Sequence, residues 1–119
     1  MKKKISVIVG GTRGIGSVIS TTLKKRGDKL LIFSRNAKKK LNNFKIDLLK
    51  KNEINQFFNN KFSKAKVDNL VFSHRYRGKN ANEDFQVSLH AVEQIIELMK
   101  NKMSKKASIV IINSIAIKT

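Results

Sequence analysis

Residues 9–16 read Val9-Gly10-Gly11-Thr12-Arg13-Gly14-Ile15-Gly16. A short apolar, β-branched run precedes this stretch and predicts a buried strand over residues 5–9. The residues that follow recur at helical spacing as far as Gly27, where we expect the helix to end. A glycine turn between a strand and a helix lets the backbone approach a phosphate, and the helix start offers free N–H groups and a positive dipole end. The stretch therefore predicts a site for the pyrophosphate of a dinucleotide.

Strand and helix signals alternate along the rest of the chain. Apolar runs predict further strands at residues 30–33, 44–46, 70–72 and 108–112. Three sets of residues carry helical spacing: Ile15, Val18, Ile19, Thr22 and Leu23; Ile54, Phe57, Phe58 and Phe62; and Phe85, Leu89, Val92, Ile96 and Met99. Continuously apolar strands between amphipathic helices are typical of a parallel sheet covered on both faces. We predict one α/β domain over residues 1–119, a three-layer, doubly wound sheet of about five strands in the order 3-2-1-4-5.

The spacing of Gly10, Gly14 and Gly16 resembles the T-G-x-x-x-G-x-G fingerprint of short-chain dehydrogenases/reductases, with Val9 where threonine is usual. The resemblance implies a Rossmann-type domain that binds NAD(P). It also implies a set of cofactor contacts, which fall here on Gly10, Thr12, Arg13, Gly14, Ile15, Gly16, Ser34, Arg35, Asp47 and Leu48. It covers the whole chain but only about the first half of the family's domain, so we expect the sheet to stop after its fifth strand.

The second predicted strand ends at Ser34-Arg35, where an NAD-binding domain usually has a carboxylate for the ribose hydroxyls. A carboxylate would repel a 2′-phosphate, whereas a guanidinium binds one through charge-assisted hydrogen bonds. Arg13 is a second basic residue that NADP-preferring members often have. These residues favour NADP(H) over NAD(H), although both arginines could also be ordinary surface charges.

Asp47 follows the third predicted strand and precedes Leu48. In the family, an acidic residue followed by a small apolar one contacts the adenine ring at this point. Asp47 could equally cap the next helix, and both roles can coexist.

Two other segments depart from the family pattern. The usual Asn-Asn-Ala-Gly after the fourth strand is replaced by Phe72-Ser73-His74-Arg75. Residues 74–77 would lie at the carboxyl end of the sheet. There they could provide cations that bind an anionic substrate or the cofactor phosphates, or they could form a solvated loop without a ligand. Ser88 stands where the family has a catalytic asparagine, and a hydroxyl cannot reproduce both amide groups.

By the same resemblance, Ser114 is the catalytic serine that hydrogen-bonds the substrate oxygen. In the family, a tyrosine and a lysine in the pattern Y-x-x-x-K complete the chemistry. Their spacing of one helical turn brings the lysine close enough to lower the pKa of the tyrosine phenol. The only tyrosine is Tyr76, in a Y-x-x-K that we reject because it is one residue short and contains Gly78. We therefore expect an NADP(H)-dependent oxidoreductase that transfers hydride on a carbonyl/alcohol substrate, present as an N-terminal part that is inactive alone. The predicted fifth strand would form an unprotected edge of the sheet. We therefore also expect poor solubility, or pairing of this edge with a missing segment or a second copy of the chain.

The composition bounds these expectations. There is no cysteine, and the two histidines are too far apart in sequence to suggest a metal site. The apolar run after Met1 is too short for a signal peptide, so we expect a soluble, cytoplasmic protein acting on a small molecule, without a membrane partner. The net charge of +18 raises the prospect of nucleic acid, but the lysines are scattered and no nucleic-acid motif accompanies them. We expect no nucleic-acid partner. A non-catalytic dinucleotide-binding module and a basic nucleic-acid-binding protein remain as alternatives.

Overall fold

The structure is a computed structural model that describes residues 3–10, 14–35, 42–60, 62, 66–76 and 78–112. Five strands form one sheet in the order β3-β2-β1-β4-β5, and every neighbouring pair is parallel. The strands are β1 (Ile5–Val9), β2 (Lys29–Ser34), β3 (Asn43–Lys45), β4 (Val67–Phe72) and β5 (Met103–Ile111). The predicted α/β class and strand order are confirmed.

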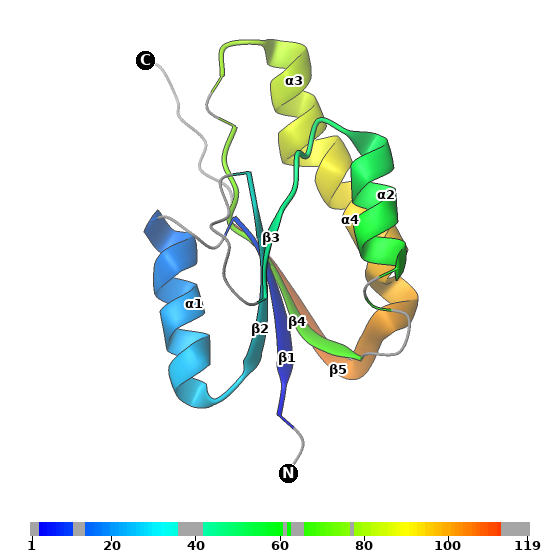
Figure 1. The fold of residues 1–119 in the computed structure, drawn as a ribbon. Coiled ribbons are helices and arrows are strands. Elements are labelled where there is room, and N and C mark those ends of the chain that lie inside the picture. Colours follow the sequence, from blue (N-terminus) through cyan, green and yellow to red (C-terminus); the bar gives the residue numbers. More distant parts are fainter. Residues whose placement is uncertain are drawn as a thin grey trace.

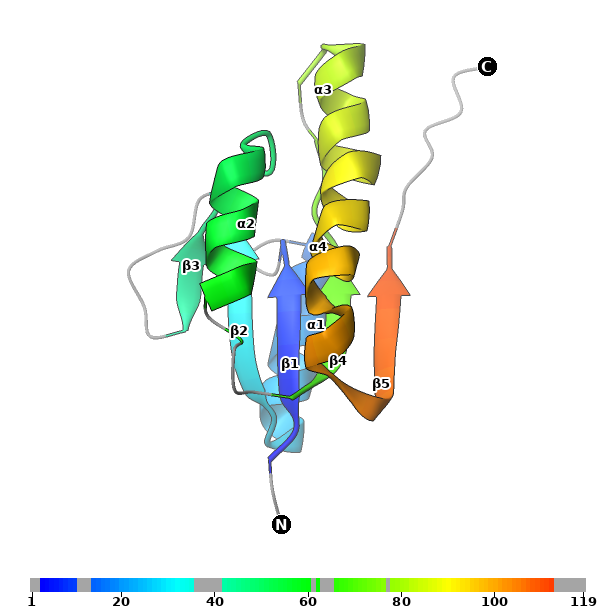
Figure 2. The ribbon, with the colours of Figure 1, turned by 90° about the vertical axis from the view of Figure 1, so that its right-hand side faces the viewer.

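Helices cover both faces of the sheet (Figure 1). Helix α1 (Gly14–Arg26) lies on one face, and α2 (Lys51–Asn60) and α4 (Ala91–Met99) lie side by side on the other (Figures 1 and 2). As expected, α1 ends just before Gly27, which has a φ of 98°. None of the described helices is both long and apolar enough to span a bilayer.

The apolar core lies between the sheet and the α2/α4 layer. Its centre is Phe33, whose ring lies 4.8 Å from that of Phe58 and 6.1 Å from that of Phe62, measured between centroids. Ile54 and Phe58 are fully buried, as their helical spacing predicts, while Phe57 is only partly buried. Aromatic residues bury a large apolar area each, so this cluster is expected to dominate the stability of the domain.

The long helix before β5 differs from its prediction. It is built from α3 (Ala81–Phe85), a π-helical turn η1 (Gln86–His90) and α4. Phe85 and Leu89, predicted to face the core, are 61% and 45% exposed, while Val87 is buried. The π turn is the reason, because its wider spacing of five residues places Val87, rather than Leu89, one turn before the buried Val92.

Helix α1 also departs from its predicted apolar face. Ile15 and Val18 are exposed, and the helix is buried instead at Gly16 and Ser20. The side-chain hydroxyl of Ser20 donates to the Gly16 carbonyl at 2.8 Å, which satisfies its polar group inside the contact. Small residues therefore let α1 pack close to the sheet, while Ile15 and Val18 remain in solvent.

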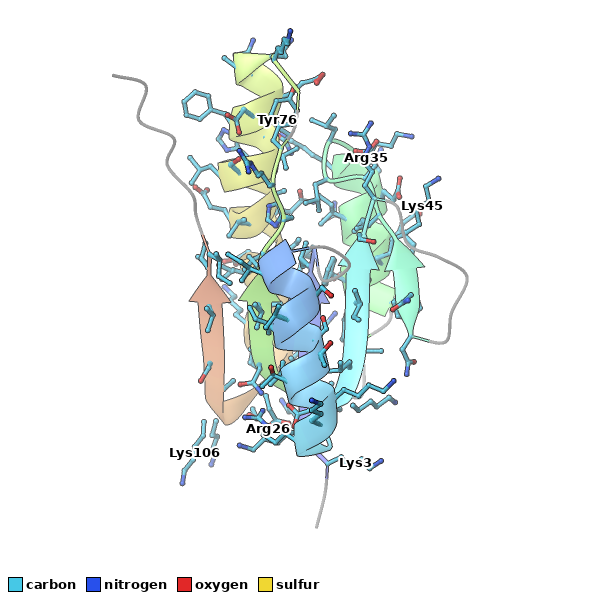
Figure 3. The ribbon with its side chains drawn as sticks, turned by 90° about the vertical axis from the view of Figure 1, so that its left-hand side faces the viewer. Lys3, Arg26, Arg35, Lys45, Tyr76 and Lys106 are labelled. Carbon is cyan, nitrogen blue, oxygen red and sulfur yellow. The ribbon has the colours of Figure 1, made fainter. Side chains whose placement is uncertain are left out.

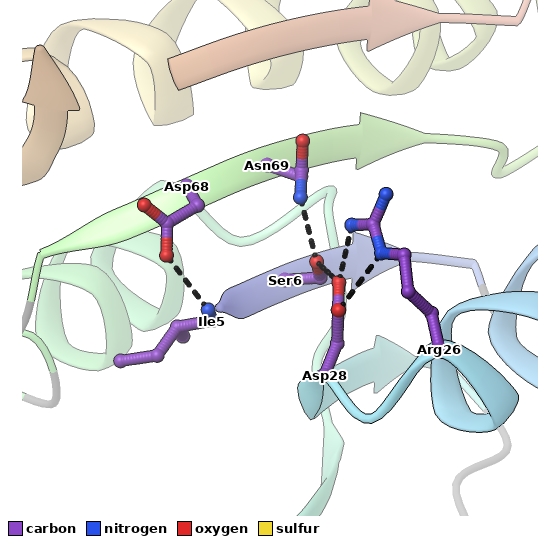
Figure 4. A network of polar contacts seen from close by, with 6 residues as sticks. All are labelled: Ile5, Ser6, Arg26, Asp28, Asp68 and Asn69. Atoms are coloured by element: carbon purple, nitrogen blue, oxygen red, sulfur yellow. Dashed lines mark hydrogen bonds and ion pairs between the residues drawn. The ribbon is translucent and has the colours of Figure 1, made fainter. Parts of the chain in front are cut away.

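Polar side chains join α1, β1 and β4 at the amino end of the sheet (Figure 4). The Arg26 guanidinium donates twice to Asp28, at 2.9 and 2.6 Å, and the buried Ser6 hydroxyl donates to the same carboxylate at 2.7 Å. The Asp28 side chain is only 3% exposed, and its hydrogen bonds with Arg26 lower the pKa of the carboxyl. A carboxylate held in this way remains charged and fully paired inside the fold.

Candidate nucleotide-binding site

The carboxyl ends of the parallel strands surround a cavity of about 630 Å³. Such clefts outside the strand ends, near the point where the strand order reverses, are where open α/β sheets bind ligands. Figure 3 shows Arg35 and Tyr76 at this end of the molecule. Five of the residues expected to contact a cofactor line this cavity: Gly10, Ser34, Arg35, Asp47 and Leu48. The fold thus brings together positions from three separate strand ends.

The glycines of the loop have a steric basis. Gly10 has a φ of 88°, and a Cβ added to it would lie 2.5 Å from the backbone nitrogen and Cα of His74. A Cβ on Gly16 would collide with the Gly10 carbonyl oxygen and with the Ser73 hydroxyl. These two glycines let the end of β1, the start of α1 and the end of β4 meet closely.

Gly14, the first residue of α1, differs from the other two glycines. Its φ is 54°, but apart from its chain neighbours and the backbone of its own helix no described atom lies within 4 Å of the position where its Cβ would be. The described structure therefore leaves room beside the first residue of α1, and a helix start is a favourable place for a phosphate group. Ile15 follows it with its side chain exposed.

Ser34 and Arg35 end β2 beside the cavity. Ser34 is 8% exposed, and its hydroxyl oxygen is buried without a hydrogen-bond partner in the described structure. Arg35 is exposed and lines the same cavity. A buried hydroxyl without a partner costs free energy, and a ligand hydroxyl or phosphate at this position would remove the cost.

Asp47 does not cap α2, which begins at Lys51. Its carboxylate accepts a hydrogen bond from the Leu49 N–H at 3.0 Å, which stabilises the turn between β3 and the helix. Its own N–H donates to the Glu53 carboxylate at 3.2 Å. This turn holds Asp47 and Leu48 at the cavity wall, so the helix-cap alternative gives way to a turn-forming role.

Ser73 and His74 preserve a tight junction despite the unusual sequence after β4. The Ser73 N–H donates to the Val9 carbonyl at 2.9 Å, and its hydroxyl lies within hydrogen-bond distance of the carbonyls of Val9 and Gly10. The His74 ring turns toward η1, where its Nε2 lies 2.8 Å from the Val87 carbonyl oxygen. Since a carbonyl only accepts, Nε2 carries the proton and Nδ1, buried without a partner, is left as an acceptor.

Burial lowers the pKa of His74, and the hydrogen bond to Val87 only partly offsets this. In the unfolded chain the imidazole recovers its ordinary value and binds a proton more readily. We expect the free energy of unfolding to be constant above about pH 6.5 and to fall as the pH is lowered from there through the folded-state pKa. Urea unfolding at a series of pH values measures this dependence. His74→Gln, which keeps a donor for Val87, should reduce it; an equal dependence in both proteins would contradict the assignment.

Tyr76 and Glu83 line the far side of the cavity, and the sequence did not suggest the contact between them. The Tyr76 hydroxyl donates to Glu83 at 3.0 Å and accepts from the Asn80 N–H at 3.1 Å. Asn80 caps α3 by accepting from the Glu83 N–H, the spacing that marks a capped helix start. That capping signal could have placed Glu83 beside the loop.

Among the described residues, Ser88 does not line the cavity. Ser88 is exposed, and its hydroxyl donates to Asp84 at 2.7 Å, which agrees with the expectation that it does not replace the family's asparagine. Thr12, Arg13, Arg77 and Ser114 lie outside the described residues. Arg75 is exposed and lines the cavity as the cation hypothesis requires, whereas His74 is held neutral by its burial.

The strand order, the glycine junction and the cavity at the strand ends define the nucleotide-binding half of a Rossmann-type domain of the short-chain dehydrogenase/reductase kind. The family model "NAD dependent epimerase/dehydratase family" matches residues 6–116, and the chain belongs to this family. The resemblance seen in the sequence is confirmed at this level. Comparison with curated proteins gave no significant match.

Solved structures share the fold at low sequence identity. Ligand-free aldohexose dehydrogenase from Thermoplasma acidophilum is similar with a TM-score of 0.81 and 19% identity, over 95% of this chain and 50% of that one. A short-chain dehydrogenase/reductase from Serratia marcescens gives 0.73 and 19%, over 93% and 57%. An oxidoreductase from Brucella ovis, in complex with a partially ordered NAD, gives 0.70 and 18%, over 85% and 58%. The chain therefore spans between half and three fifths of the length of these structures.

Proposed function

We propose that the chain holds NADP(H) for an oxidoreductase that transfers hydride between the cofactor and a carbonyl/alcohol pair. The observation that carries the cofactor preference is the end of β2. Ser34 offers a buried hydroxyl without a partner and Arg35 offers a guanidinium, both at the cavity wall. No carboxylate stands at this position to repel a 2′-phosphate.

In this proposal, different residues of the chain bind different parts of the cofactor. Gly14 and the start of α1 leave room and N–H donors for the pyrophosphate. In this proposal Asp47 and Leu48 contact the adenine ring, and Ser34 and Arg35 hold the substituted ribose; all four residues line the cavity. Bound NADPH supplies the hydride, and Ser114 would donate a hydrogen bond to the substrate oxygen on which charge develops.

Direct titration tests this proposal. We expect NADPH to bind the purified chain more tightly than NADH, because only NADPH carries the phosphate that Arg35 can pair with. Isothermal calorimetry with both nucleotides gives the two dissociation constants. Equal dissociation constants would contradict the preference for NADP(H) but not the nucleotide site. If neither nucleotide bound, the nucleotide site itself would be contradicted.

The 119 residues by themselves are expected to bind cofactor without reducing carbonyls. Tyr76 is the single tyrosine of the sequence, and its hydroxyl is engaged by Glu83 and Asn80 in the loop before α3. The residue four positions after it is Asn80 and not a lysine, so Tyr76 does not form the Y-x-x-x-K pair that the family uses for proton transfer. Loss of NADPH absorbance with a panel of aldehydes and ketones measures the activity, and turnover by this chain would refute the expectation.

A further inference from the structure

The fold gathers lysines that are scattered in the sequence. The amino ends of all strands meet at one edge of a parallel sheet, opposite the cavity. In Figure 3, Lys3, Arg26 and Lys106 lie together at this end, away from Arg35 and Tyr76. We define the amino-end cationic surface by six exposed residues: Lys3, Lys4, Lys24, Lys25, Lys29 and Lys106.

Three of these lysines belong to the amino-end edge of the sheet. Lys29 opens β2 beside Lys4, and its N–H donates to the Lys4 carbonyl at 2.8 Å. On the other side of β1, the register of β4 and β5 is irregular between Val67 and Asn69, and exposed Lys106 lies in the corresponding part of β5. Lys29 and Lys4 lie on adjacent segments about 4.8 Å apart, whereas Lys106 on β5 is two strand spacings from β1 because β4 lies between them. Both spacings are of the same order as the distances between phosphates along a nucleic-acid strand.

The acidic residues near this surface are too few to cancel its positive charge. All eight aspartates and glutamates belong to the described part of the chain, and three of them lie near this end. Asp28 is paired with Arg26, Asp68 accepts from the Ile5 N–H at 2.9 Å, and Glu97 is paired with Lys100. At the opposite end, by contrast, Asp47 and Glu83 line the cavity together with Arg35 and Arg75.

The partner that fits is an extended polyanion rather than a lipid surface. The exposed large apolar side chains of the described residues are on the outer side of α1, on α3 and η1, and in the last residues of β5. None of them is among the lysines at the amino end, so the surface has no apolar anchor for a bilayer. No aromatic residue is exposed there for base stacking either.

From this segregation of charge we propose that the amino-end cationic surface binds the phosphate backbone of nucleic acid, without sequence preference. The surface lies at the edge of the sheet opposite the nucleotide cavity, so both ligands bind at once. Binding through phosphates alone makes the affinity steeply dependent on salt. The sequence-based expectation of no nucleic-acid partner rested on scattered lysines, which the fold brings together.

The test compares two variants of equal net charge. In the first variant, glutamine replaces Lys3, Lys29 and Lys106. In the control variant, glutamine replaces three exposed lysines at the opposite end: Lys50, Lys51 and Lys79. Fluorescence anisotropy with a short labelled single-stranded RNA measures affinity across a salt series. Each single-strand phosphate contact contributes about 0.7 to the slope of log K against log salt, so the first variant should lose about 2 from that slope and roughly 100-fold in affinity at 0.1 M salt.

The control variant should lose several-fold less, and saturating NADPH should leave RNA affinity unchanged. Circular dichroism checks that both variants are folded. Equal weakening in the two variants, no RNA binding by the parent chain, or binding to phosphatidylserine vesicles in place of RNA would each overturn the proposal. None of these outcomes depends on whether NADPH binds in the cavity.

Discussion

Gly10→Ala is expected to destabilise the chain by about 2–5 kcal/mol, a large fraction of the roughly 5–15 kcal/mol by which an ordinary domain is stable. A non-glycine residue with positive φ costs about 1–2 kcal/mol, and an added methyl group in a packed junction costs about 1–3 kcal/mol more. Both costs apply at Gly10, because the new Cβ would lie 2.5 Å from the backbone of His74. That neighbour is backbone and cannot turn away as a flexible side chain would. Urea unfolding followed by circular dichroism measures the change.

Gly14→Ala is the matched control for this effect. Gly14 also has a positive φ, of 54°, but its Cβ would enter open space. We expect a loss of only about 1–2 kcal/mol there, from the backbone conformation alone. Equal losses at the two positions would show that contact with His74 does not set the requirement for Gly10.

Arg35→Ala is expected to weaken NADPH binding by about 10- to 100-fold and to leave NADH binding nearly unchanged. The estimate follows from the about 1.5–3 kcal/mol that a hydrogen bond to a charged group contributes. The 2′-phosphate is the only difference between the two nucleotides, so a change confined to NADPH locates the phosphate at the end of β2. Calorimetric titration of both nucleotides into parent and variant gives the comparison.

Lys45→Ala controls for the loss of one positive charge near the same site. Lys45 is exposed on β3 opposite Ser34 in the strand register, but it does not line the cavity. Its removal should weaken NADPH binding by less than about threefold, as expected for a screened surface charge. A Lys45 effect as large as that of Arg35 would mean that general attraction, rather than direct contact, accounts for the preference.

Much of the architecture could be predicted from the sequence because its signals are local. The apolar run before Gly10 and the stop at Gly27 mark a strand and a helix whose bounds the structure reproduces closely. Parallel topology follows from strands that alternate with helices, and the carboxyl ends of such strands converge. Ser34 and Asp47 could therefore be assigned to one site although they are distant in the sequence.

The remaining features depend on tertiary contacts that no local pattern encodes. A regular α-helix was assumed for residues 85–99, and the π turn at Gln86–His90 makes Val87 the buried residue. The hydrogen bond from His74 to Val87 and the contact between Tyr76 and Glu83 arise only when separate segments pack together. The convergence of lysines at the amino end is of the same kind, because it follows from strand order rather than from spacing along the chain.

The widened turn at Gln86–His90 also changes how this helix must be matched to others. Consider a relative in which this helix is α-helical throughout. Compared with it, the π turn displaces by about one residue the positions that face the core on one side of the turn. An alignment without a compensating gap would pair a core residue such as Val87 with a solvent-facing neighbour, and would equate Ser88 with a catalytic asparagine on letter order alone. Assigning functional residues along this segment therefore requires superposed coordinates rather than sequence alignment.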